Sequence, residues 1–183
     1  MIMPVVSEQE MFSAMHQTTD QIIEQIRLAC PKGDLPPTLF IRFMDQSGNR
    51  DIVMMSRDSL GDTLTQRQET LYSAGQAIGT DHDKQVLMVI LASMSWGVIK
   101  PAKGEEHVMP SKSPRREEMI ALTSMTADKR QAMSIIRLDR SADGVMIPLY
   151  SEHLSEKTPG SSVQNNLLPF FFEGYHLQND QGQ

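Results

Sequence analysis

The chain has 183 residues, one cysteine and a formal net charge of -6 at pH 7. This length suits a single domain, which can bury enough surface to fold without disulfides or a structural metal. The composition, 39% hydrophobic and 22% charged, excludes a disordered chain, and the single cysteine excludes an intramolecular disulfide.

The N-terminal half predicts two helices separated by a β-hairpin. In the first segment apolar residues recur at helical spacing, Ser7 and Glu10 have the spacing of a capping box, and Pro31 follows the end. Two β-forming segments then flank DQSGNR, whose Ser, Gly and Asn favour a hairpin turn. A second segment at helical spacing ends at Gly79. The predicted elements are a helix over 7–29, strands over 38–44 and 51–56, and a helix over 62–79.

The most apolar run of the chain, Val86 to Ile99, has 14 residues. A membrane-spanning helix needs about 20, so we expect no membrane span here. The β-branched residues and Gly97 favour a central strand that is apolar on both faces, and a buried helix is the alternative left open. Residues 100–118, with three prolines and mixed charges, predict a long loop. Short turns then separate the strands of an antiparallel meander, predicted over 118–126, 132–140 and 144–151.

These elements predict an α+β fold, with a largely antiparallel sheet of about five to six strands, two main helices on one face and an apolar C-terminal segment. We assign residues 1–150 to this single domain, and residues 151–183 to a linker and an apolar docking segment. The three phenylalanines from 170 to 172 cannot all face one side of a helix or strand, so another surface should cover part of them. That surface is either the chain's own sheet or a second subunit, and the sequence leaves both open.

Sequence motifs of the common enzyme classes are absent. The chain has no GxSxG, GxxxxGK[ST] or GxGxxG motif, and its five histidines lack metal-ligand spacing. We therefore assign no catalytic residue, no metal ligand and no cofactor. Asp81, His82 and Asp83 form the densest polar triplet. With carboxylates such as Glu117 they define one alternative function, a metal-dependent hydrolase whose carboxylate and histidine residues are scattered along the chain.

Two apolar features indicate a binding surface instead. The only tryptophan, Trp96, lies near the end of the apolar run and just before the basic loop. A tryptophan in this position can anchor a partner. The three consecutive phenylalanines supply a second apolar surface. The acidic net charge and the glutamates of the loop argue against nucleic-acid binding. The candidate partner-binding residues are Trp96, Arg115, Arg116, Phe170, Phe171 and Phe172.

Taken together, these patterns favour a soluble, cytoplasmic, non-enzymatic interaction or assembly protein that binds a protein partner or itself. The N-terminus lacks the positively charged start of a signal peptide, and a single cysteine fits a reducing compartment. The fourteen methionines suit irregular gaps in a core or an adaptable binding surface. No pattern names the partner or the process.

Overall fold

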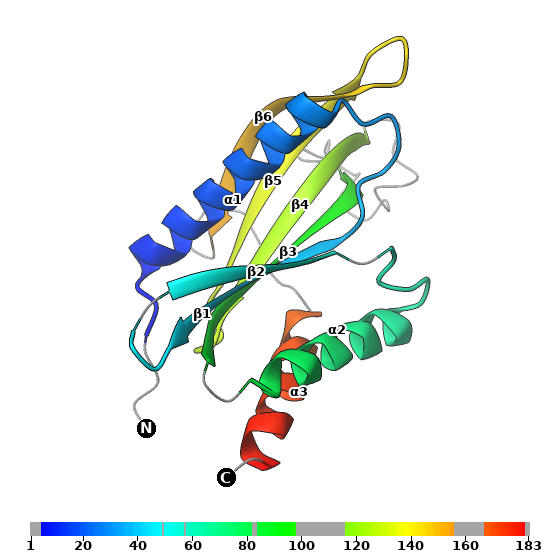
Figure 1. The fold of residues 1–183 in the computed structure, drawn as a ribbon. Coiled ribbons are helices and arrows are strands. Elements are labelled where there is room, and N and C mark those ends of the chain that lie inside the picture. The colour runs from blue at the N-terminus through cyan, green and yellow to red at the C-terminus, as the bar shows by residue number, and fades with distance from the viewer. Residues whose placement is uncertain are drawn as a thin grey trace, which may run out of the picture.

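The computed structural model describes residues 5–48, 50–56, 58–81, 84–97, 116–155 and 167–181. These residues form three helices and one antiparallel sheet of six strands (Figure 1), so the fold is α+β as the sequence predicts. Across the sheet the strands are ordered β2-β1-β3-β4-β5-β6. None of the helices described is both long and apolar enough to cross a membrane. In chain order the elements are α1 (Glu8–Ala29), β1 (Thr38–Asp45), β2 (Arg50–Ser56), α2 (Leu64–Gly79), β3 (Lys84–Gly97), β4 (Glu117–Thr126), β5 (Gln131–Arg140), β6 (Met146–Ser155) and α3 (Leu168–Gln181).

Local signals fix the ends of the helices. The Ser7 hydroxyl accepts the N–H of Glu10 while the Glu10 carboxylate accepts the N–H of Ser7, so the predicted capping box is present. α1 ends where the backbone of Cys30 turns left-handed, with a φ of 47°, and the N–H of Cys30 bonds to the carbonyl of Ile26. The predicted hairpin is the pair β1 and β2, and the predicted meander is the run from β4 to β6.

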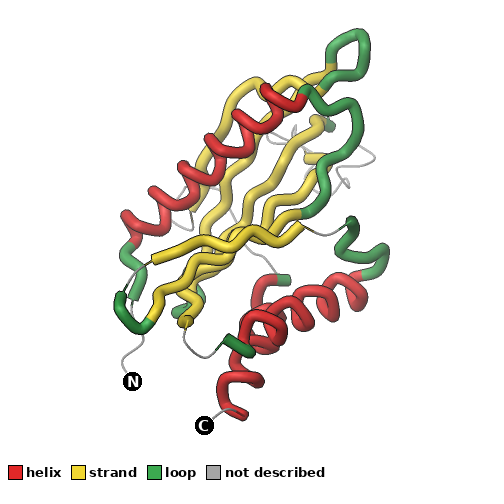
Figure 2. Tube along the Cα trace, in the orientation of Figure 1, coloured by secondary structure: helices red, strands yellow, loops and turns green. Residues whose placement is uncertain are grey.

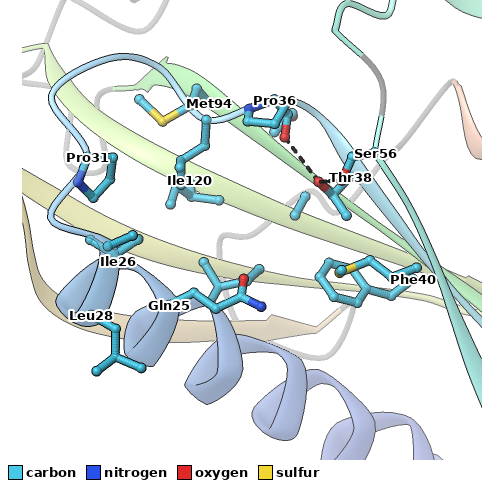
Figure 3. Close-up of a pocket in the computed structure, with 16 residues that line it drawn as sticks. Gln25, Ile26, Leu28, Pro31, Pro36, Thr38, Phe40, Ser56, Met94 and Ile120 are labelled. Carbon is cyan, nitrogen blue, oxygen red and sulfur yellow. Dashed lines mark hydrogen bonds between the residues drawn. The ribbon is translucent and has the colours of Figure 1, made fainter.

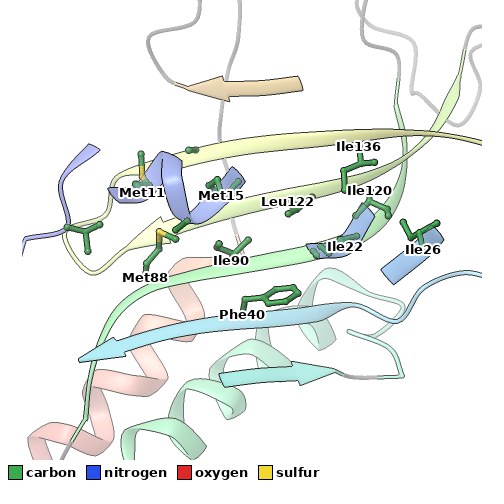
Figure 4. Close-up of a cluster of buried hydrophobic side chains, with 14 of the residues drawn as sticks. Met11, Met15, Ile22, Ile26, Phe40, Met88, Ile90, Ile120, Leu122 and Ile136 are labelled. Atoms are coloured by element: carbon green, nitrogen blue, oxygen red, sulfur yellow. The ribbon is translucent and has the colours of Figure 1, made fainter. Parts of the chain in front are cut away.

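The two longest helices lie on opposite faces of the sheet (Figures 1 and 2), which corrects the prediction that both cover one face. α1 packs over β4, β5 and β6, and its apolar stripe joins a buried cluster that includes Phe40, Ile90 and Leu122 (Figure 4). α2 and α3 cover the other face, in a second cluster that includes Leu39 and Ile41. Because β1 and β3 are apolar at successive positions, both of their faces must be covered.

The C-terminal segment packs against its own chain. β6 continues past the predicted domain boundary at residue 150, and α3 packs against α2; residues 156–166 of the predicted linker lie outside the described residues. Phe171 and Phe172 are buried in the second cluster, while Phe170 is half-buried. The hydroxyl of Tyr175 accepts the N–H of Val86 at 3.1 Å and thereby connects α3 to β3. The chain itself therefore covers two of the three phenylalanines.

Candidate functional site

A cavity of about 550 Å³ opens between the C-terminal half of α1 and the sheet (Figure 3). The segment between α1 and β1 forms one wall, and β1, β2, β3 and β4 form the floor. Elements far apart in the sequence therefore meet here. The residues that line it are Ile22, Gln25, Ile26, Leu28, Ala29, Pro31, Leu35, Pro36, Thr38, Phe40, Met54, Ser56, Ala92, Ser93, Met94 and Ile120.

None of these 16 described lining residues carries a charge. Ile26, Phe40 and Ile120 are buried parts of the first apolar cluster, whereas Leu28 is 77% exposed and Met54 is 53% exposed. A cavity of this size with an apolar lining and a few neutral polar groups is typical of a site that binds an apolar group.

The cavity reaches the edge of the sheet because β2 is an edge strand. Met54 lies opposite Phe40, and Ser56 lies opposite Thr38. The hydroxyls of Thr38 and Ser56 are hydrogen-bonded at 3.0 Å, and Thr38 also donates to the carbonyl of Pro36 at 3.1 Å. The polar groups on this side of the cavity are therefore partnered within the chain, and the Met54 side chain is the apolar group at the edge.

A second cavity of about 460 Å³ lies along the N-terminal half of α1 and is polar. Arg50 forms an ion pair with Glu10, and hydrogen bonds from Ser7 lower the pKa of Glu10 to about 2. Arg42 donates to the side-chain oxygen of Gln17 at 2.8 Å, and burial lowers the pKa of Arg42. The buried Nε of Arg42 has no hydrogen-bond partner among the described residues. The two cavities beside α1 thus differ in charge: the first has no charged residue in its described lining, and the second is lined by Glu10, Arg42, Arg50 and Asp51.

None of the candidate partner-binding side chains that the structure describes lines either cavity. The backbone of Trp96 pairs with Glu118 in the sheet, but its side chain lies outside the described residues, as does Arg115. Arg116 directly precedes β4. Phe171 and Phe172 belong to the buried cluster between α3 and the sheet. The selection of these residues for partner binding remains a hypothesis.

Two carboxylates of the alternative metal site, Asp81 and Glu117, form ion pairs. Asp81 pairs with Lys84 at 3.1 Å, while His82 and Asp83 lie outside the described residues. Glu117 pairs with Arg137 at 2.9 Å. Within the part of the chain that the structure describes, no three His, Cys, Asp or Glu side chains are grouped so that they could hold a metal ion.

Two histidine rings join α1 to β6. His16 and His153 have ring centroids 3.6 Å apart. Ser134, which lies opposite His153 in the sheet, shares a buried hydrogen bond of 3.0 Å with Thr19 of α1. Burial lowers the pKa of His153, the neighbouring His16 lowers it further, and Asp20 opposes the shift. We therefore expect protonation of His153 to weaken the contact between α1 and β6.

We expect the free energy of unfolding to fall as the pH drops below 6.5, the ordinary pKa of histidine. Because the pKa of folded His153 is lowered, the unfolded chain binds more protons just below that pH, and acid favours unfolding. His153→Phe keeps a ring that cannot titrate, so it should reduce the loss of stability between about pH 7.5 and 5.5. Urea unfolding at both pH values measures the loss.

His176→Phe, on α3, is the matched control and should keep the dependence of the parent protein. If His153→Phe lost as much stability on acidification as the parent, the His16–His153 contact would not be the source of the effect.

Comparisons with protein families, with curated proteins and with solved structures found no match. The cavity could not be found from the sequence because its lining residues come from five elements and one connection, with no common spacing. The signal present in the sequence is indirect: β2 carries four consecutive apolar residues, Ile52 to Met55, so both faces of this edge strand are apolar.

Proposed function

We propose that this chain is a non-enzymatic interaction protein, and that another protein or a second copy of the chain docks where the uncharged cavity opens beside β2. The observation that carries this proposal is the cavity: none of its described lining residues is charged, although 22% of the chain is charged. Pockets that receive apolar anchor residues supply much of the binding energy of protein interfaces.

The side chains at the mouth support the same proposal. Leu28 and Met54 expose more than half of their surface on two sides of the opening. Burying an apolar side chain of this size contributes about 1.5–3 kcal/mol. A partner that covers both residues and also fills the cavity gains several such contributions, which offset the entropy lost on association.

Site-specific photo-crosslinking in cells of the native host tests this function. A photoreactive amino acid at position 28, at the mouth, should give one adduct of defined mass. The same amino acid at position 64 replaces Leu64, which is 60% exposed on α2 and lies outside the cavity. It should give no such adduct. An adduct of twice 20.6 kDa would identify a second copy of the chain as the partner.

Met54→Glu is expected to reduce the adduct formed from position 28 by at least about tenfold, because it places an unpaired charge against an uncharged pocket. Leu64→Glu, an equivalent change on α2, should leave that adduct unchanged. Equal crosslinking from positions 28 and 64, or an adduct insensitive to Met54→Glu, would contradict the proposal.

A further inference from the structure

We propose that the partner binds as an extended segment that adds a strand to the open edge of β2, with an uncharged apolar side chain inserted into the cavity. This inference rests on the function proposed above and names the form of the partner. It depends on two independent features that lie side by side: backbone groups of β2 that no strand of the described sheet pairs with, and a cavity whose described lining is uncharged.

The backbone groups of β2 that point away from the sheet can be assigned from one hydrogen bond. The N–H of Ile52 donates to the side chain of Asp51 at 2.7 Å, so it does not point toward β1. In an antiparallel pair, residues that bond to the neighbouring strand alternate with residues that do not. The β1–β2 register is regular from Thr38 to Met44. Met54 and Ser56 therefore also direct their N–H and C=O groups away from β1.

The pairing of side chains agrees with this assignment. Opposed residues that share no backbone hydrogen bonds bring their side chains closest together. Thr38 and Ser56 are opposed, and their hydroxyls are 3.0 Å apart. β2 pairs with β1 alone in the sheet that the described residues form, so the outward groups of Met54 and Ser56 have no strand beside them.

The same two residues line the cavity, and this connects the edge to the pocket. Side chains of opposed residues on neighbouring strands lie on the same face, with Cβ atoms about 4.5–5.5 Å apart. A residue paired with Met54 therefore places its side chain on the face of the sheet that carries Met54, Phe40 and the cavity. In strand addition, backbone hydrogen bonds supply affinity and such pockets supply specificity.

The uncharged lining determines which side chain the added segment inserts, and the Asp51 carboxylate limits the length of that segment. An ionised side chain in the cavity would meet no opposite charge among the described lining residues and would lose its hydration, so the inserted residue is uncharged. Toward the start of β2, the carboxylate of Asp51 already occupies the outward N–H of Ile52. The added strand therefore pairs chiefly with Val53 to Ser56 and is short.

The test uses a random heptapeptide library displayed on phage and selected against the folded full-length protein. The enriched peptides are synthesised and their Kd is measured by fluorescence anisotropy. We expect enriched sequences with uncharged apolar residues at alternating positions. N-methylation of the peptide amides that face β2 should raise the Kd by at least about tenfold, because the methyl group removes the donor and blocks the approach.

Two substitutions at one position test the backbone of the protein. Met54→Pro removes an N–H that points away from β1, whereas Met54→Val keeps the N–H and an apolar side chain. Met54→Pro should weaken the peptides by at least about tenfold relative to Met54→Val. Thermal unfolding checks that both variants fold. If Met54→Pro does not fold, the N-methylated peptides test the same backbone hydrogen bonds on the unaltered protein.

The outcomes separate this inference from the proposed function. If Met54→Glu abolishes binding while N-methylated peptides and Met54→Pro bind normally, the cavity is a docking site and strand addition is wrong. If binding survives Met54→Glu, both proposals are wrong. If no sequence is enriched over an unrelated protein, strand addition is wrong, and the crosslinking experiment decides the function alone.

Discussion

Gly75→Ala is expected to destabilise the protein by about 3 kcal/mol or more, at the upper end of what overpacking costs. α2 and α3 cross with their backbones in contact, and a Cβ on Gly75 would lie 1.9 Å from the carbonyl oxygen of Phe171. The obstacle is backbone, which cannot rotate away as a side chain can. Helix propensity alone predicts the opposite sign, since alanine in a helix interior is favoured over glycine by about 0.5–1 kcal/mol.

Gly174 makes the reciprocal contact from α3, because its added Cβ would lie 2.1 Å from the carbonyl oxygen of Tyr72. Gly174→Ala should therefore destabilise the fold to a similar extent. Gly33→Ala is the control, since nothing lies within 4 Å of a Cβ at that position. Urea unfolding followed by circular dichroism measures all three variants. A Gly75→Ala protein as stable as the parent would show that the helices do not cross at this distance.

The sequence predicts the elements well because their signals are local. A capping box needs only Ser7 and Glu10 at a fixed spacing, and both of its hydrogen bonds are present. The hairpin and the meander follow from β-forming segments separated by short turns. Periodicity assigns residues to elements, but it does not say which face of the sheet each helix covers.

The face of the sheet that α2 covers could have been inferred from β3. Val86 to Ala92 are apolar at every position, and the structure buries all seven. A strand that is buried on both sides needs a layer on both sides. Placing α1 and α2 on opposite faces meets this need, and α3 adds to the layer that α2 forms.

The cavity, by contrast, can be identified only from the three-dimensional structure. Ile26, Pro36, Met54 and Ile120 converge only because the cavity lies between the C-terminal half of α1, the segment that follows it, and the strands of the sheet. Each of these residues is ordinary in its own element. The glycines of α2 are visible in the sequence, but a close helix crossing also requires a partner helix. That partner, α3, lies some 90 residues further along the chain, so the crossing could not be predicted from α2 alone.

Phe171→Ala is expected to cost about 3–5 kcal/mol of stability, the range for removing a fully buried aromatic ring. Phe171 is 0% exposed, belongs to the second cluster together with Leu71, and packs edge to face on Phe172 with ring centroids 5.6 Å apart. The neighbouring Phe170→Ala is the matched control. Phe170 is half-buried and outside the cluster, so its loss should cost much less.

This pair of variants also separates the two roles considered for the C-terminal segment. If α3 serves mainly as a part of the core, Phe171→Ala lowers the midpoint of urea unfolding and leaves crosslinking from position 28 unchanged in the protein that stays folded. Deleting α3 would expose Leu39, Ile41 and Val89, which it helps to bury, so truncation disturbs folding before it reports on any partner. A Phe171→Ala protein of unchanged stability would instead mean that α3 is held only weakly on its own sheet and is free to dock elsewhere.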